Sequence, residues 1–176
     1  CGIADYSRSL IRALHSLPAA PAPPGVEVLP LPRQAPPSVY AALGTALNDA
    51  DVAHVQHAYS FFGGMHPLRG RRWRILLQRV RVPLLVTLHE FDARGTGAHR
   101  LPPGLERRYK TWFNRRSFLH PAIGAWHTHA QEIRHALLDF GVPPSRVVWN
   151  PLPVELPQHP VSGDQAIGHN SAVRAL

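Results

Sequence analysis

The chain has 176 residues, of which 44% are hydrophobic, so it is long enough to bury the core of one domain of ordinary size. Its single cysteine, Cys1, excludes a disulfide-stabilised mini-protein, and the sequence holds no run of about 18 apolar residues that would cross a bilayer. The formal net charge of +8 allows contact with nucleic acid, anionic lipid or phosphorylated substrates without choosing among them. No secretory signal pattern is visible, and we expect a cytoplasmic location.

Helices and strands are expected to alternate along the chain. Apolar residues at helical spacing, with stops at proline or glycine, predict helices over 4–17, 38–48, 67–81, 105–119 and 128–140. Short apolar or β-branched runs predict strands over 26–31, 51–56, 83–88, 122–126 and 146–149. Ser38 is expected to cap the second helix. This alternation predicts the α/β class, with a Rossmann-like parallel sheet and helices on both of its faces.

The domain is expected to span residues 1–153. Residues 154–176 show no periodicity and are expected to form a linker or a disordered tail. A parallel sheet of this kind should open with a strand, and none precedes Gly2, so the first strand is expected to be missing from the sequence.

Two segments lie where an α/β sheet is expected to bind ligands. Gly2 stands just before the first helix, where a ligand can approach the backbone and the helix N-terminus favours anions. His89 and Glu90 follow the predicted buried strand 83–88, at the edge of the sheet where ligands bind. His89 could bond a sugar or phosphate, or act as an acid or base near neutral pH. A plain N-terminal turn and a polar strand terminus remain the alternative interpretations.

A metal site is not expected. His54 and His57 lie three apart, so on an extended strand they face opposite sides and would not share a metal ion. No cysteine is available near them as a further metal ligand, and no glutamate lies between or just after them at the spacing of a zincin motif.

The segment 67–81 is rich in arginine. Its basic face could lie against anionic lipid headgroups, or it could be an ordinary solvated surface. Nucleic-acid binding is not expected, because no aromatic stacking motif accompanies the charge. The arginines expected to face a membrane are Arg69, Arg71, Arg72, Arg74 and Arg79.

Four segments in order resemble the N-terminal half of a family 4 glycosyltransferase of the GT-B fold. They are CGIADYSRSLIRAL at the start, DVAHVQHAYSFFGG, PLLVTLHEF, and the closing RVVWNPLPV. Two departures stand out: Ala58 replaces the glutamate of the family's Q-H-E-Y, and residues 150–153 replace its P-N-G-V hinge. The resemblance implies that the present domain is one half of a GT-B fold.

The resemblance also implies roles for individual residues. Gly2 and Ile3 would approach the donor diphosphate, and His89 would contact the donor sugar and assist the transfer. The acceptor side of the cleft would be lined by His57, Tyr59 and Glu90.

The implied function is the acceptor side of a retaining glycosyltransferase that moves a sugar from a nucleotide-sugar donor to a glycan or lipid acceptor. The nucleotide sugar is a co-substrate, and no cofactor is expected. The donor domain, with its E-x7-E motif, is not in this sequence, so the chain alone is expected to be inactive or nearly so. A non-enzymatic basic module, docking peripherally on the inner face of an anionic membrane through 67–81, is the alternative.

Overall fold

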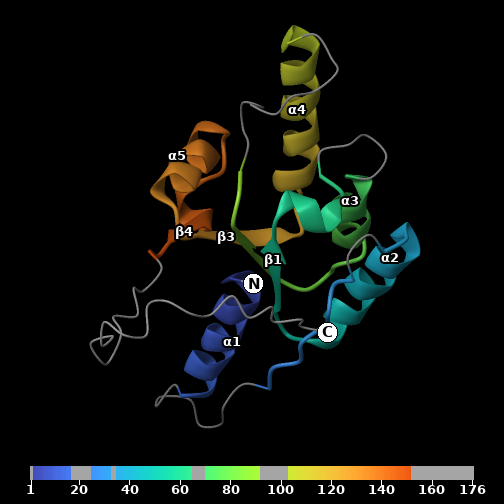
Figure 1. The fold of residues 1–176 in the computed structure, drawn as a ribbon, viewed down its shortest axis with the longest axis vertical. Helices are drawn as coiled ribbons and strands as arrows, with labels where there is room; N and C mark the ends of the chain where they lie inside the picture. The colour runs from blue at the N-terminus through green and yellow to red at the C-terminus, as the bar shows by residue number, and fades with distance from the viewer. Residues whose placement is uncertain (1, 17–24, 33–34, 65–69, 92–102, 152–176) are drawn as a thin grey trace, which may run out of the picture.

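The computed structural model describes residues 2–16, 25–32, 35–64, 70–91 and 103–151. Its centre is a four-stranded parallel sheet in the order β1-β2-β3-β4 (Figure 1). The strands are β1 (Ala53–His57), β2 (Leu84–Leu88), β3 (Ile123–Thr128) and β4 (Val147–Trp149). The helices are α1 (Gly2–His15), α2 (Pro37–Ala46), α3 (Arg71–Leu77), α4 (Pro103–Phe118) and α5 (Gln131–Asp139), with 3₁₀ turns η1 (Leu47–Asp49), η2 (Tyr59–Phe62) and η3 (Pro144–Arg146).

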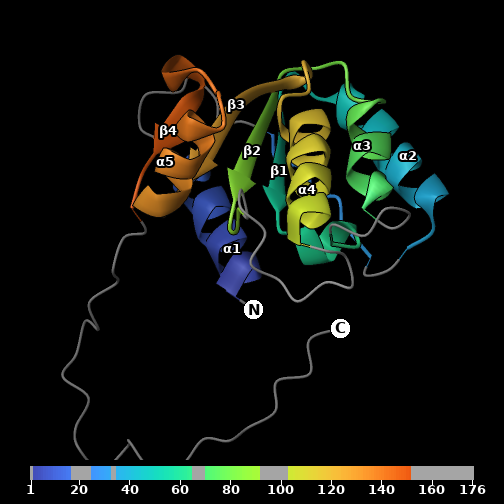
Figure 2. The same cartoon turned by 90° about the horizontal axis from the view of Figure 1, so that it is seen from above.

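Helices cover both faces of the sheet, as the sequence predicts. Strands that pair in chain order through right-handed crossovers place the crossover helices on one face. On that face the His57 ring lies 4.9 Å from Trp73 of α3 and 5.2 Å from Phe118 of α4. On the other face Tyr6 of α1 lies 6.5 Å from the His127 ring, and Figure 2 shows α1 beginning near the tip of β2. The Rossmann-like α/β class is therefore confirmed.

The core lies between the sheet and the α2–α3–α4 layer. Trp73 is buried there, and its indole Nε1 donates a hydrogen bond to the Ser117 carbonyl at 3.1 Å, which ties α3 to α4. The hydroxyl of buried Tyr40 donates to the Phe61 carbonyl at 2.8 Å and ties α2 to η2. Gly44 lets α2 approach α3 closely, because a Cβ there would lie 2.5 Å from the Leu76 carbonyl oxygen.

Three expectations about local structure are wrong, whereas the ends of the other expected elements differ from the structure by at most three residues. Residues 26–31 form no strand, and Val28 is 65% exposed. The helix expected over 67–81 is only Arg71–Leu77 within the described residues, because the Asn48 side chain bonds the backbone of Arg79 and Arg81 and draws the chain toward β2. Ser38 lies inside α2 rather than capping it, since Pro37 takes the first helical position that proline favours.

Residues 154–176 lie outside the described residues, so the domain boundary at 153 stays a prediction. In the part of the chain that the structure describes, no helix is long and apolar enough to cross a membrane.

Candidate functional site

The two faces of the sheet differ in polarity. In the parallel register Val55, Val86 and Trp126 are neighbours, and they face the apolar core. The next register row joins Gln56, Thr87 and His127, which point to the opposite side because successive strand residues alternate. A polar row therefore crosses three strands on the face that α1 covers, and it leads to the carboxyl edge of the sheet.

His89 directly follows β2 at this edge. Its Nε2 lies 2.6 Å from the side-chain oxygen of Gln56. Its ring is half-buried, 6.0 Å from the ring of Tyr6 and 6.3 Å from that of His129. Burial, followed by the proximity of His129, lowers the pKa of His89 below its ordinary value. The imidazole is therefore uncharged at neutral pH.

The hydrogen bond from His89 continues into a chain across the sheet. The Gln56 amide nitrogen lies 3.4 Å from His54 Nε2, which lies 2.8 Å from the Thr87 hydroxyl, and that hydroxyl lies 3.0 Å from His127 Nδ1. Burial, reinforced by the neighbouring histidines, lowers the pKa of His127 to about 4 and also lowers the pKa of His54.

The directions of these bonds follow from chemistry. An amide NH₂ only donates, so His54 Nε2 accepts and the Thr87 hydroxyl must also donate to it. Thr87 then accepts from the Nδ1–H of His127. At the other end the Gln56 carbonyl oxygen only accepts, so His89 carries its proton on Nε2. Among the described residues no hydrogen bond reaches the Nδ1 of His89, so this nitrogen can accept one from a hydroxyl group.

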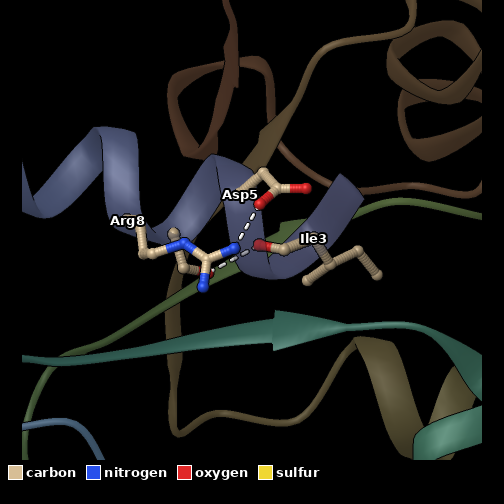
Figure 3. Close-up of polar contacts among 4 residues, drawn as sticks. Ile3, Asp5 and Arg8 are labelled. Carbon is tan, nitrogen blue, oxygen red and sulfur yellow. Dashed lines mark hydrogen bonds and ion pairs between the residues drawn. The ribbon is translucent and has the colours of Figure 1, made fainter. Parts of the chain in front are cut away.

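The first turn of α1 supplies the expected donor-side residues. Gly2 and Ile3 are the first two residues of this helix rather than part of a loop. The Ser7 hydroxyl donates to the Ile3 carbonyl at 2.9 Å, and Asp5 pairs with Arg8 in the same turn (Figure 3). The Arg8 guanidinium lowers the pKa of Asp5 and offsets its negative charge near this helix end.

Tyr6 packs α1 onto the edge of the sheet. Its ring lies 4.6 Å from the His129 ring in an edge-to-face contact. The Nδ1 of His129 bonds the Asn150 carbonyl at 2.7 Å, which connects the end of β3 with the segment after β4. The site therefore gathers residues from α1, the ends of three strands and the segment following the fourth.

His57 lies on the other face. Its side chain is 1% exposed, stacked at 5.0 Å on Phe62 and in edge contact with Trp73 and Phe118. Burial lowers the pKa of His57 to about 3. The structure therefore places this ring in the aromatic core, away from the edge where His89 lies.

Tyr59 and Glu90 connect the ends of β1 and β2. The Glu90 carboxylate accepts the backbone N–H of Tyr59. The Tyr59 hydroxyl donates to the Asn114 side-chain oxygen at 3.3 Å, which reaches α4. Glu90 is exposed and Tyr59 is half-buried, so both lie at the surface of this edge.

The arginines expected to face a membrane do not share one environment. Arg71 and Arg79 are exposed, but Arg79 lies beyond the end of α3. Arg72 lies over the Tyr40 ring at 5.5 Å, and Arg74 lies over an indole of α4 at 5.6 Å. Arg69 is outside the described residues.

Four histidines crowd the site: His54, His89, His127 and His129. Among the residues that the structure describes, no group of three or more potential ligands is arranged to hold a metal ion. The contacts of Gln56 and Thr87 were not predicted from the sequence. Strand alternation combined with the register of the sheet would have revealed them, but a single sequence does not give the register.

The chain has a parallel α/β sheet of the Rossmann-like class, with polar residues at the carboxyl edge, where sheets of this class bind ligands. The family model of Glycosyltransferase Family 4 matches residues 4–156, and the chain belongs to this family, whose members are retaining transferases of nucleotide sugars. No curated protein and no solved structure matches the chain.

Proposed function

We propose that this domain forms the acceptor side of sugar transfer from a nucleotide-sugar donor to a glycan or lipid acceptor. The observation that carries the proposal is the position of His89, held by Gln56 at the end of β2 and beside the start of α1. A neutral imidazole whose Nδ1 can accept a hydrogen bond suits a sugar hydroxyl. The nearby amino end of α1 suits the charge that develops on a departing diphosphate.

The remaining residues divide between the two substrates. Gly2 and Ile3, in the first turn of α1, would lie toward the donor diphosphate. Tyr59 and Glu90, at the ends of β1 and β2, would contact the acceptor. We assign His57 to the support of this edge from the core, because its ring is buried among aromatic side chains.

We further propose that the 176-residue chain transfers sugar slowly or not at all by itself. The family's donor side uses an E-x7-E motif, and no pair of glutamates in this sequence has that spacing. A purified chain that transferred sugar from a nucleotide-sugar donor at the rate of an ordinary enzyme would contradict this part of the proposal.

Histidine NMR tests the site without requiring turnover. The purified chain is titrated with UDP, GDP and their sugar conjugates, and separately with oligosaccharide and glycolipid acceptors, while the Cε1–H resonance of His89 is followed. We expect a ligand of one of these classes to shift this resonance. We also expect His89→Ala to weaken the binding of that ligand about tenfold, measured by isothermal titration calorimetry. The control is His135→Ala, at an exposed position of α5. The proposal fails if none of these ligands shifts the resonance, or if both variants bind equally.

The alternative of a non-enzymatic module docked through 67–81 is not favoured. The arginines on which it rests divide between two exposed positions and two that cover aromatic rings, so they form no single flat surface.

A further inference from the structure

His54 lies at the junction of the hydrogen-bond chain that leads to His89. Its Nε2 is 2.8 Å from the Thr87 hydroxyl and 3.4 Å from the Gln56 amide nitrogen, so two donors converge on one nitrogen. A neutral imidazole accepts at one ring nitrogen and donates at the other, so the proton of His54 is on Nδ1. Burial, followed by the proximity of His89, lowers the pKa of His54 and keeps its ring neutral at pH about 8.

The amide of Gln56 connects His54 with His89. Its nitrogen end faces His54, and its oxygen end lies 2.6 Å from Nε2 of His89. Rotation about the last side-chain bond would exchange the two ends, and an amide NH₂ and a carbonyl oxygen fill nearly the same space. Shape alone therefore does not fix the orientation of this amide. The acceptor nitrogen of His54 fixes it, because that nitrogen can bind only the NH₂ end.

The opposite arrangement shows what His54 contributes. A proton on Nε2 of His54 would make that nitrogen a donor, and the Gln56 amide would turn its oxygen toward it. The NH₂ group would then face Nε2 of His89, which would have to accept, so the proton of neutral His89 would move to Nδ1. The Nδ1 of His89 would then donate to a ligand rather than accept from one.

The Thr87 hydroxyl reinforces the observed direction of the chain. It donates to Nε2 of His54 and accepts from Nδ1 of His127 at 3.0 Å. A hydroxyl has one proton to give, so both bonds would have to reverse together if the proton of His54 moved. A change of tautomer at His54 would therefore disturb bonds on β1, β2 and β3 at once, which makes the direction of the chain a cooperative property.

We propose that His54 is a positioning residue that determines which nitrogen of His89 carries the proton. By accepting the Gln56 amide it keeps the proton of His89 on Nε2 and leaves Nδ1 able to accept a hydrogen bond from a hydroxyl group. His54 acts through Gln56 and does not itself touch a substrate. The consequence for sugar transfer rests on the proposed function, whereas the tautomer of His89 does not.

Two variants with opposite hydrogen-bonding properties separate positioning from packing. At pH about 8 a glutamate side chain only accepts hydrogen bonds and a lysine ammonium only donates them, although both replace the ring by a flexible chain. His54→Glu should keep the Nε2–H form of His89 as the major one. His54→Lys should turn the Gln56 amide and make the Nδ1–H form the major one. If His54 only filled space, the two variants would have the same effect.

Nitrogen NMR of the full 176-residue chain with isotope-labelled histidine identifies the tautomers without any ligand. The signals of each ring are assigned by their loss when that histidine is replaced. At pH about 8 we expect the wild type to carry the proton of His54 on Nδ1, and the Nε2–H form of His89 to exceed the Nδ1–H form at least about tenfold. This ratio should fall at least about tenfold in His54→Lys and change less than about threefold in His54→Glu.

His57→Phe is the matched control. His57 belongs to the same strand, but its ring points into the core and stacks on Phe62. This variant should leave the tautomer ratio of His89 within about twofold of wild type. Circular dichroism and melting temperature show which variants are folded, and the wild-type measurement tests the proposal even if neither His54 variant folds.

Three results would overturn the proposal. The first is a wild type in which His54 carries its proton on Nε2 or His89 carries its proton on Nδ1. The second is the same ratio in folded His54→Glu and folded His54→Lys. The third is a change in His57→Phe as large as that in His54→Lys. None of these readouts uses a ligand, so they are distinct from a failure of the proposed function, which the ligand titrations test.

Discussion

His57 makes the stability of this fold depend on pH. Its ring is 1% exposed in a cage of Phe62, Trp73 and Phe118, and this burial lowers its pKa from 6.5 to about 3. The charged form is therefore strongly disfavoured in the folded state. In the unfolded chain the same imidazole is hydrated and titrates near its ordinary value.

The sign of the effect follows from proton binding. Between pH about 3 and about 6.5 the unfolded chain binds a proton at His57 and the folded chain does not, so acid favours unfolding. This contribution to stability is fully present above the unfolded pKa and is lost as the pH falls through the window. At pH about 5, about 1.5 units below the unfolded pKa, the loss is about 2 kcal/mol, because each unit corresponds to about 1.4 kcal/mol.

Urea unfolding of wild type and His57→Phe measures this loss. Phenylalanine keeps a flat ring against Phe62 and removes the titrating group. Between pH about 7.5 and about 5 the wild type should lose about 2 kcal/mol more than the variant. His54, His89 and His127 also have lowered pKa values and destabilise both proteins in acid, so only the difference between them reports on His57. An equal loss in both proteins would refute the buried position of this ring.

Two further predictions concern the site and the packing. Gln56→Glu places a carboxylate against Nε2 of His89 and should raise the pKa of His89 by about 1 unit or more, followed through its Cε1–H resonance; an unchanged pKa would mean that the 2.6 Å contact does not form in solution. Gly44→Ala should cost about 2 kcal/mol, because its Cβ would meet the Leu76 carbonyl at 2.5 Å and force α2 from α3. Gly104→Ala, whose Cβ meets nothing within 4 Å, should stay within about 0.5 kcal/mol of wild type. Equal melting temperatures for these two glycine variants would argue against that close packing.

The four strands could be predicted because the apolar pattern of each one lies within a single short segment of the sequence. Each of β1 to β4 overlaps an apolar run that the sequence marks as a strand, and a single run of this kind needs no knowledge of its partner. Residues 26–31 show the limit of this reasoning. They have strand-like composition, but a strand exists only through hydrogen bonds to a neighbour, and the structure gives them none.

The position of His89 at the edge of the sheet was predictable from the sequence, whereas its hydrogen-bond contacts were not. A histidine directly after a buried parallel strand is placed by topology at the ligand-binding edge. The chain of hydrogen bonds from Gln56 through Thr87 to His127 depends on which residue of each strand lies opposite which. The sequence of one strand carries no information on that register, so these contacts emerge only when the sheet is assembled.

The end of β1 shows how the direction of each side chain along a strand affects the choice of functional residues. The family resemblance draws attention to His57, but alternation along the strand sends His57 into the core and its neighbour Gln56 toward His89. The two residues therefore support the same edge from opposite sides: one by filling an aromatic cage, the other by holding an imidazole in one tautomer. Substituting His57 should change stability first, whereas substituting Gln56 should change the protonation of His89. Measuring both properties in both variants separates residues that build the edge from residues that set its chemistry.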